Sequence, residues 1–415
     1  MILKWRQHFV TNFRRCLSSR TILGIETSCD DTGVAIVTED GKILSDICVS
    51  QTALHVSNGG IIPPLARDRH RAVIDKCVSQ SLEISGLKAS ELNAVAVTVM
   101  PGLPLSLGIG CLYAKKLSAK YNLPVIPIHH MQAHALTAMM EYKNLEFPFV
   151  TLLISGGHCL IAYVNSVEDF RLLGTCLDNA PGDILDKTAR QLRLKNLGEP
   201  FNKMSGGAAI ELMAKNGNAF AYFTQVATNP LYRIRTCNFS FSGFLNLIKK
   251  QIQKLEDQHN ILPHAVLPET SDICASILYT LSFTLIRRLQ RAFQYLDEKS
   301  ILPDDGSVTR RLVISGGCAA NKFITSMISQ FCKEHIIEIF VPSPRLCTDN
   351  GLMIAWNGAL KLKTASHTVL HDQNDIQSLN YDSRAPIGID LTYNVTQEHI
   401  KTHRLDIKRY VQEIS

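Results

Sequence analysis

The stretch ILGIETSCDDTGVAIV at residues 22–37 decides the fold, because it sets a polar loop between two short apolar runs. Residues 22–25 and 34–37 are apolar, whereas the loop between them holds acidic and hydroxyl side chains. Two apolar runs around a turn predict a β-hairpin. The turn directs hydroxyl and backbone N–H groups to one place, which suits an anion or a hydrated metal ion, with an ordinary polar turn as the alternative.

The same plan recurs further along the chain. Residues 149–154 and 159–164 are apolar runs around the loop Ser155-Gly156-Gly157-His158, and the apolar run 312–314 leads into SGGCAANK. Apolar side chains recur at helical spacing in residues 71–84, 105–120, 276–296 and 323–331. We therefore predict an α/β protein with an internal duplication and a cleft between its halves.

Paired glycines mark two of these loops. Without Cβ atoms, Gly156, Gly157 and the pair at positions 316 and 317 let the backbone approach a ligand closely. The N–H groups that open the helix after residue 317 favour phosphate. One glycine pair is a weak signal, but three equivalent strand-to-loop positions are able to surround one nucleotide.

Composition and charge limit the class of protein. With 46% hydrophobic and 19% charged residues, the 415-residue chain is globular rather than disordered. The net charge is +6, but the first 25 residues hold five basic residues and no acid, so bulk charge beyond them does not argue for nucleic-acid binding. The 12 cysteines include no CxxC pair, which disfavours a zinc ribbon and favours free thiols.

The leader MILKWRQHFVTNFRRCLSSR mixes arginine with serine and large apolar side chains. An acid-free amphipathic segment of this kind is typical of a mitochondrial presequence, with an untargeted basic tail as the alternative. We expect residues 1–20 to be this presequence, with cleavage as late as about residue 34. The rest is expected to form an N-terminal subdomain at 21–145, a C-terminal subdomain at 146–382 and a tail at 383–415.

His130 and His134 are four residues apart, so on a helix their rings share one face and are able to bind one metal ion. Chance pairs with this spacing are common, and a structural histidine pair is the alternative. Asp349, in a loop that opens a helix, is the candidate third ligand. A metalloprotease is disfavoured, because it needs a glutamate beside the first histidine as general base, whereas Met131 and Gln132 cannot take a proton from water.

Seven segments occur in the order seen in the tRNA threonylcarbamoyladenosine transferases, between about residues 22 and 358. They are ILGIETSCDDTGVAIV, HHMQAH, LLISGGH, DNAPGDILDK, FSFSG, LVISGGCAANK and CTDNG. The chain therefore resembles this family and, with its basic leader, the mitochondrial members. It departs from the family pattern at HHMQAH (usually NHMEGH), at DNAPGDILDK (usually DDAAGEAFDK) and in a longer stretch at 192–207.

The resemblance implies an actin-like (ASKHA) fold, in which two α/β subdomains enclose a nucleotide cleft. It implies transfer of the threonylcarbamoyl group of threonylcarbamoyl-adenylate to N6 of the adenosine 3′ of the anticodon, in tRNAs reading codons that begin with A, with release of AMP. The implied setting is the mitochondrion. The implied partners are tRNA, the adenylate and a second copy of the chain in a homodimer without membrane insertion, and the implied cofactor is one divalent ion per subunit, zinc or iron.

The resemblance also assigns roles by position. The metal ligands are His130, His134 and Asp349. The catalytic candidates are Glu26, Asp30 and His158, with Glu26 and Asp30 facing the reacting group. The substrate-binding positions are Leu153, Ile154, Ser155, Gly156, Gly157, Asp186, Gly207, Glu211, Ala320, Asn321 and Thr348.

Two other functions stay open at this stage. An actin-like ATPase or kinase shares the loops but has no use for the histidine pair, and a noncatalytic scaffold of a tRNA-modification complex tolerates loss of His130. For tRNA, two basic clusters are candidates, one at residues 67–71 and one formed by Arg287, Arg288 and Arg291. A solvated helix face is the alternative for both clusters.

Overall fold

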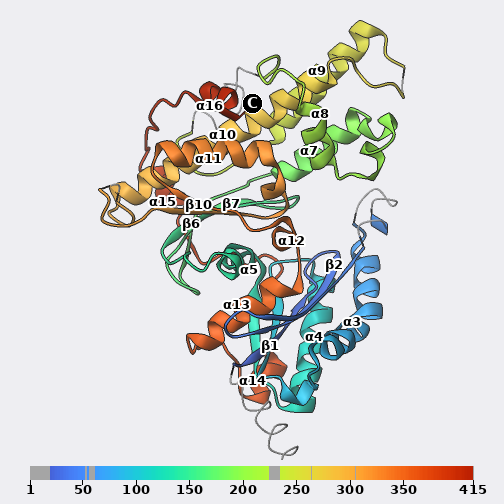
Figure 1. The fold of residues 1–415 in the computed structure, drawn as a ribbon, viewed down its shortest axis with the longest axis vertical. Coiled ribbons are helices and arrows are strands. Elements are labelled where there is room, and N and C mark those ends of the chain that lie inside the picture. Colours follow the sequence, from blue (N-terminus) through green and yellow to red (C-terminus); the bar gives the residue numbers. More distant parts are fainter. Residues whose placement is uncertain are drawn as a thin grey trace, which may run out of the picture. The chain divides into compact units, whose positions relative to one another are not determined.

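The computed structural model describes residues 19–51, 54–55, 61–223, 234–262, 264–303 and 305–414, and Figure 1 shows its helices and strands. Residues 1–18, most of the expected presequence, lie outside this range. The chain divides into two compact units. Unit 1 comprises Met1–Met140 and Asp349–Ala385, and unit 2 comprises Glu141–Thr348 and Pro386–Ser415.

Unit 1 is built on a five-stranded mixed sheet of order β3-β2-β1-β4-β5. Neighbours β1–β2 and β2–β3 are antiparallel, whereas β1–β4 and β4–β5 are parallel. Its strands are β1 (Thr21–Glu26), β2 (Asp31–Thr38), β3 (Ile43–Ser50), β4 (Ala94–Met100) and β5 (Val125–His129). The expected first hairpin is therefore present as β1 and β2.

Helices cover both faces of this sheet, as Figure 1 shows. They are α3 (Pro63–Ser85), α4 (Pro104–Tyr121), α5 (His130–Leu136), α6 (Ala138–Glu141), α13 (Gly351–Lys363) and α14 (Gln373–Ser378), with a 3-10 turn η1 at Ala89–Glu91. Because side chains alternate along a strand, Leu23 and Ile25 enter the core shared with α3 and α4, and Gly24 faces α13.

Glycines bring α13 against the backbone of the β1–β2 hairpin. A Cβ atom at Gly24 would lie 2.3 Å from the backbone nitrogen of Ala355, and one at Gly33 would lie 2.5 Å from the nitrogen of Gly351. Only glycine allows backbones to approach this closely. The packing carries Asp349, two residues before α13, to the hairpin of unit 1.

Unit 2 contains a six-stranded sheet of order β10-β9-β6-β7-β8-β11. Pairs β6–β7 and β7–β8 are antiparallel, and β6–β9 and β9–β10 are parallel. Its strands are β6 (Phe149–Ile154), β7 (Cys159–Val164), β8 (Phe170–Thr175), β9 (Arg311–Ser315), β10 (Glu338–Phe340) and β11 (Ile389–Asp390). The first five strands repeat the order and directions of unit 1, so the predicted α/β class and its duplicated, actin-like plan are confirmed.

The helices of unit 2 share one large core with its sheet. They are α7 (Pro181–Gln191), α8 (Gly206–Ala214), α9 (Ser242–His259), α10 (Thr270–Glu298), α11 (Lys322–Glu334), α12 (Pro344–Cys347), α15 (Thr392–Gln397) and α16 (Ile407–Ile414). Short 3-10 turns are η2 (Leu194–Leu197), η3 (Phe201–Lys203) and η6 (Gly317–Ala320). Across the described residues, no helix combines the length and apolar character needed to cross a membrane.

The two units differ from the contiguous division expected from the sequence, 21–145 and 146–382. Residues 349–385 follow unit 2 in the chain but belong to unit 1, because the glycine contacts of α13 fit the β1–β2 backbone. The segment 383–415, expected to be a tail, mostly belongs to unit 2. There β11 pairs with β8, and the core includes Val395 and Tyr410; the elements are too short to leave a clear pattern.

Candidate functional site

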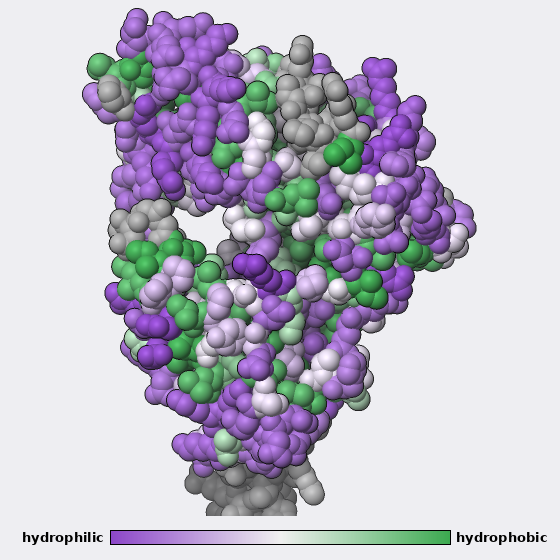
Figure 2. Space-filling model, turned by 180° about the vertical axis from the view of Figure 1, so that it is seen from behind, coloured by the Kyte–Doolittle hydropathy of each residue, from purple (hydrophilic) through white to green (hydrophobic). Residues whose placement is uncertain are grey.

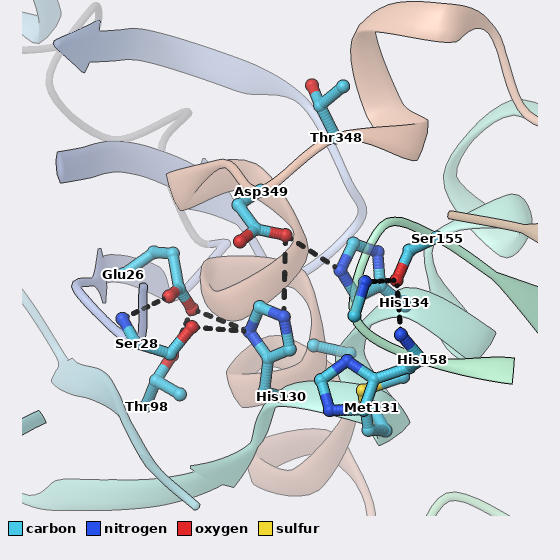
Figure 3. Close-up of polar contacts among 12 residues, drawn as sticks. Glu26, Ser28, Thr98, His130, Met131, His134, Ser155, His158, Thr348 and Asp349 are labelled. Carbon is cyan, nitrogen blue, oxygen red and sulfur yellow. Dashed lines mark hydrogen bonds and ion pairs between the residues drawn. The ribbon is translucent and has the colours of Figure 1, made fainter. Parts of the chain in front are cut away.

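Two imidazoles and one carboxylate converge in unit 1. One ligand atom from each of His130, His134 and Asp349 lies within 4.8 Å of the others. The Nε2 atoms of His130 and His134 are 3.4 and 3.1 Å from Oδ1 of Asp349, as the dashed lines of Figure 3 show. The two rings are nearly perpendicular, with centroids 4.7 Å apart. Three donors of this kind form a group that is able to hold a metal ion.

Local structure places each of the three side chains. Strand β5 ends at His129, and α5 begins at His130, so the i, i+4 spacing predicted from the sequence brings both rings to one face. Asn350 caps α13 by accepting a hydrogen bond from the backbone N–H of Met353, at 2.9 Å. This cap fixes the residue that follows Asp349. Both imidazoles are buried, whereas the Asp349 side chain is 26% exposed.

Glu26 lies behind His130 and is fully buried. One oxygen accepts a hydrogen bond from the backbone N–H of Ser28 at 2.5 Å. The other accepts one from the hydroxyl of Thr98 at 2.5 Å and lies 3.1 Å from Nδ1 of His130. Figure 3 shows this arrangement, with His130 between the Glu26 and Asp349 carboxylates. The expectation that Glu26 faces the reacting group stays a prediction; its carboxylate is enclosed by these three partners.

The carboxylate of Glu26 selects the proton position on His130. Because an ionised carboxylate only accepts, the Nδ1 atom that faces it carries a proton. The Nε2 atom of His130 is then the one that faces Asp349 and His134. Nδ1 of His134, by contrast, is buried without a hydrogen-bond partner among the described residues. One histidine of the pair is thus oriented by a carboxylate, and the other is not.

The charges of this cluster shift their own pKa values in the metal-free protein. Burial alone would raise the pKa of Asp349, but the charge on His130 and hydrogen bonds from both histidines hold it well below its usual range. Burial would lower the pKa of His130, but the carboxylates of Asp349 and Glu26 raise it well above its usual value. His130 therefore binds a proton at the place where a metal ion would bind.

Another histidine, His70 of α3, forms hydrogen bonds with the first hairpin loop. Nε2 of His70 lies 3.0 Å from the carbonyl oxygen of Cys29, and its Nδ1 lies 2.7 Å from the hydroxyl of Thr32. Since the carbonyl only accepts, Nε2 carries the proton and Nδ1 accepts from Thr32. Burial lowers the pKa of His70. Asp30, a catalytic candidate from the sequence, is half-buried in this loop.

In unit 2, the loop between β6 and β7 is open. Leu153 and Ile154 are buried in β6, whereas Gly156, Gly157 and His158 are exposed. A Cβ atom at either glycine would meet nothing within 4 Å. The hydroxyl of Ser155 accepts hydrogen bonds from the backbone N–H groups of residues 157 and 158, at 3.3 and 3.0 Å. The hydroxyl of Ser155 thus ties the loop together, while Gly156, Gly157 and His158 remain exposed.

Two further elements of unit 2 lie directly against this loop. A Cβ atom at Gly316, whose φ is +91°, would lie 2.5 Å from the carbonyl oxygen of Ile154. One at Gly182, near the start of α7, would lie 2.8 Å from Cα of Gly156. The glycine loops at 155–158 and 316–317 are therefore neighbours, as the equivalent strand ends predicted.

Other predicted substrate-binding residues form a second group in unit 2. The backbone N–H groups of Gly206 and Gly207 hydrogen-bond to Asp186. The carboxylate of Glu211 accepts a hydrogen bond from the backbone N–H of Lys322 at 2.7 Å. Asn321 caps α11 through Oδ1, while its buried Nδ2 has no partner among the described residues. Ala320 and Thr348 are exposed.

One of the two predicted basic clusters is not available to a ligand. Arg288 and Arg291 are each only 5% exposed. Both donate hydrogen bonds to the carbonyl oxygen of Thr236 at 2.8 Å, so these guanidinium groups support the chain rather than face solvent. In the other cluster, Arg67 pairs with the neighbouring Asp68.

Sequence reasoning did not find Ser28, Thr98 or the packing role of Gly24. Thr98 carried a signal, because it is a single polar residue inside the apolar run AVAVTVM. A buried hydroxyl needs a partner, and that partner is Glu26, 72 residues away. The partner itself depends on the pairing of β1 with β4.

Comparisons with known proteins agree with the resemblance. A family model described as tRNA N6-adenosine threonylcarbamoyltransferase matches residues 42–356. The human protein named mitochondrial tRNA N6-adenosine threonylcarbamoyltransferase is 43% identical over 389 residues, 94% of this chain and 91% of its own. The Xenopus tropicalis protein of that name is 44% identical, over 94% of this chain and 93% of its own. A Drosophila melanogaster protein, named as probable, is 42% identical over 89% and 90%.

Solved structures with a similar chain trace have little sequence in common with this protein. HypF of T.kodakarensis has a TM-score of 0.48 and 15% identity, and the match covers 84% of this chain and 48% of that one. Component A of the Acidaminococcus fermentans (R)-2-hydroxyglutaryl-CoA dehydratase has a TM-score of 0.45 and 14% identity, over 84% of this chain and all of the other. The sequence matches, by contrast, reach the family level. The chain belongs to the tRNA N6-adenosine threonylcarbamoyltransferases, and among them to the mitochondrial enzymes.

Proposed function

We propose that this enzyme transfers the threonylcarbamoyl group of threonylcarbamoyl-adenylate to N6 of the adenosine 3′ of the anticodon in mitochondrial tRNAs reading codons that begin with A. AMP is the leaving group, so this step needs no ATP hydrolysis. The observation that supports the proposal best is the convergence of His130, His134 and Asp349, because an actin-like ATPase or kinase has no use for such a group.

The three converging side chains would hold one divalent ion. Two imidazole nitrogens and one carboxylate oxygen suit zinc or ferrous iron, and the site keeps positions for other ligands. A bound ion supplies Lewis acidity, which polarises a phosphate or carbamate oxygen. The partly exposed Asp349 leaves one side of the group accessible, as an ion that contacts substrate requires.

Glu26 is a positioning residue for this group rather than a general base. Its enclosed carboxylate holds the Nδ1 proton of His130 at 3.1 Å, which presents the Nε2 lone pair to the ion. Carboxylate–histidine–metal arrangements of this kind raise the basicity of the ligand and fix its ring. Burial alone would raise the pKa of Glu26, but the charge on His130 and its hydrogen bond lower it, while the hydroxyl of Thr98 and the N–H of Ser28 orient the carboxylate.

The glycine loops of unit 2 are the proposed cradle for the adenylate. Gly156, Gly157 and Gly317 are exposed, and a Cβ atom at any of them would meet open space, so the phosphate of the leaving AMP is able to approach this backbone closely. The buried Nδ2 group of Asn321 has no partner among the described residues, so it suits a polar group of the nucleoside. The carboxylate of Glu211, which accepts from the N–H of the next residue, Lys322, suits another.

Acyl transfer to N6 of adenosine is difficult because the amine lone pair is delocalised into the ring. Catalysis therefore depends on placing the amine beside the activated carbonyl and on stabilising charge at the carbonyl and the phosphate. The residues described above supply binding and charge stabilisation, and none is assigned as general base. A homodimer is part of the proposal and follows from the resemblance alone.

The test combines the purified protein with threonylcarbamoyl-adenylate and an unmodified mitochondrial tRNA transcript. Mass spectrometry of the nucleosides should detect N6-threonylcarbamoyladenosine. His134→Ala should lose bound metal and lower the rate by more than about 100-fold, which is the upper end for a change outside the ligand shell. His371→Ala, an exposed histidine of unit 1, is the matched control and should keep both. Full activity in His134→Ala would refute the proposed metal-dependent site.

A further inference from the structure

Positive charge is concentrated in the helices that unit 2 carries between β8 and β9. From the start of α7 to the end of α9, residues 181–259 include 11 lysines and arginines against 6 aspartates and glutamates. That surplus of five nearly equals the net charge of the whole chain, +6. The part of the protein beyond the leader is thus locally basic here, although its overall charge is small.

Helix α9 has one apolar and one basic face. Phe244, Leu245, Ile248, Ile252 and Leu255 are buried in the core of unit 2. Lys249, Lys250 and Lys254 are exposed. Lys250 and Lys254 lie one turn apart, and like charges at this spacing destabilise a helix. The acids that follow this pair along the helix are Glu256 and Asp257, two and three residues beyond Lys254.

Hydrogen bonds tie α7 and η2 to α9 and extend the basic face. The side-chain amide of Gln191 donates to the carbonyl oxygen of Lys249 at 3.5 Å. Arg193 forms an ion pair with Glu256 near the end of α9. The exposed residues Arg190 and Lys195 lie within two positions of Gln191 and Arg193 in the chain, so they adjoin these contacts with α9. Figure 2, which views the molecule from behind, shows hydrophilic residues gathered over the part of unit 2 that holds α9.

The acids nearby are already engaged. Glu256 pairs with Arg193, Asp257 accepts from the amide of Gln253 at 2.8 Å, and Asp183 pairs with Lys187. Within the described part of the chain, Lys195, Lys249, Lys250 and Lys254 form no ion pair. Burial raises the pKa of Asp186, and the charge on Arg190 lowers it only slightly against this larger effect. The cations therefore face solvent without protein partners.

We propose that Lys249, Lys250 and Lys254, with Arg190 and Lys195, form a surface that binds the phosphate backbone of tRNA. This α9 basic face rests on the proposed function, because it assigns the tRNA contacts of that same enzyme. Ammonium groups on flexible stems neutralise phosphates without reading bases. The surface therefore contributes affinity and orientation, while selection of the adenosine belongs elsewhere. It takes the place of Arg288 and Arg291 of α10, which are buried.

The experiment compares the full-length enzyme with the triple variant Lys249→Gln, Lys250→Gln and Lys254→Gln. Dissociation constants for the tRNA transcript are measured between about 50 and 200 mM salt. If the three lysines contact phosphates, the dependence of log affinity on log salt should flatten by about two to three, and affinity at the lower salt should fall about tenfold or more. The KM for tRNA should rise, with kcat at saturating tRNA changed little.

A matched variant removes the same charge elsewhere. Lys42→Gln, Lys88→Gln and Lys363→Gln alter three exposed lysines of unit 1 and should keep the wild-type affinity and salt slope. If the α9 variant behaves like this control while the wild type modifies tRNA, the α9 basic face is not the tRNA surface. If the wild type does not modify tRNA at all, the proposed function fails instead, and the melting temperatures of both variants show whether folding explains a loss.

Discussion

The β1–β2 loop of unit 1 and the β6–β7 loop of unit 2 follow equivalent strands of the two sheets, yet they differ in burial and hydrogen bonding. In the first, Glu26, Thr27 and Ser28 are buried and hydrogen-bonded. In the second, Gly156 and Gly157 are exposed, and a Cβ atom at either would meet open space. The two halves thus share the order of their strands, whereas the side chains of the two loops differ and suit different ligands.

The difference has a physical basis in what each loop must hold. A carboxylate that orients a metal ligand has to be shielded from water and supplied with donors, because exposed charges interact weakly. A loop that binds a phosphate has to let the ligand approach its backbone closely, which glycines without Cβ atoms allow. The side chains of the first loop are therefore buried among other residues of unit 1, whereas the glycines of the second loop are exposed to solvent.

The largest effect is expected from a methyl group added to each loop region. Gly33→Ala would place Cβ 2.5 Å from the nitrogen of Gly351, so the hairpin and α13 must move apart, at a cost of about 1–3 kcal/mol or more. Gly157→Ala has open space and should change stability by less than about 0.5 kcal/mol. Thermal unfolding of the two variants measures the contrast, and equal losses would show that the two loops do not differ in packing.

A smaller effect is expected from removing the charge behind His130. Glu26→Gln keeps the size of the side chain but loses the anion that fixes the Nδ1 proton. Affinity for zinc, measured by competition with a chelator, should fall about 10–100-fold. The visible spectrum of the cobalt-loaded protein should also change.

The matched control is Glu39→Gln, which alters the residue that pairs with Arg20 at the other end of β2. This variant should bind zinc like the wild type. If Glu26→Gln melts at the wild-type temperature and binds zinc equally well, Glu26 does not position His130. Replacement of Thr98 by Ser, which keeps the hydroxyl, should preserve zinc affinity, whereas Val at this position should weaken it.

The smallest effect concerns the clamp on the first loop. Burial lowers the pKa of His70 in the folded protein, so the unfolded chain binds a proton more readily. Stability therefore falls as the pH drops through the unfolded value, about 6.5. His70→Gln removes this titration and should show a smaller decrease in melting temperature between about pH 7.5 and 5.5. A decrease as large as that of the wild type would contradict the neutral, clamped state.

Local patterns explain which parts of the fold were predictable. The strands β6 and β7 match the predicted runs 149–154 and 159–164, because alternating loops and apolar runs are properties of neighbouring residues. The predicted helices are present, but the beginning of one was predicted too late: α3 begins at Pro63, whereas the pattern indicated residue 71. Polar and basic residues fill its first turns, so the apolar period starts late.

Longer-range features escaped the sequence for the opposite reason. Residues 383–415 were expected to be a tail, but their short elements complete the core of unit 2 through partners such as β8. The sequence predicted a basic face on α10 that includes Arg288 and Arg291, but both side chains donate to the carbonyl oxygen of Thr236 and are buried. Burial by a distant segment leaves no mark in the local period of a helix.

The two hairpins, the shared face of His130 and His134, and the family of the chain were predictable, because each depends on spacing within one element or on the order of motifs. The contact of Asp349 with these histidines, the position of Glu26 on the Nδ1 side of His130 and the exposure of each basic residue depend instead on the folded chain. These outcomes bring together residues 52 to 215 positions apart in the chain, and packing rather than local sequence determines such contacts.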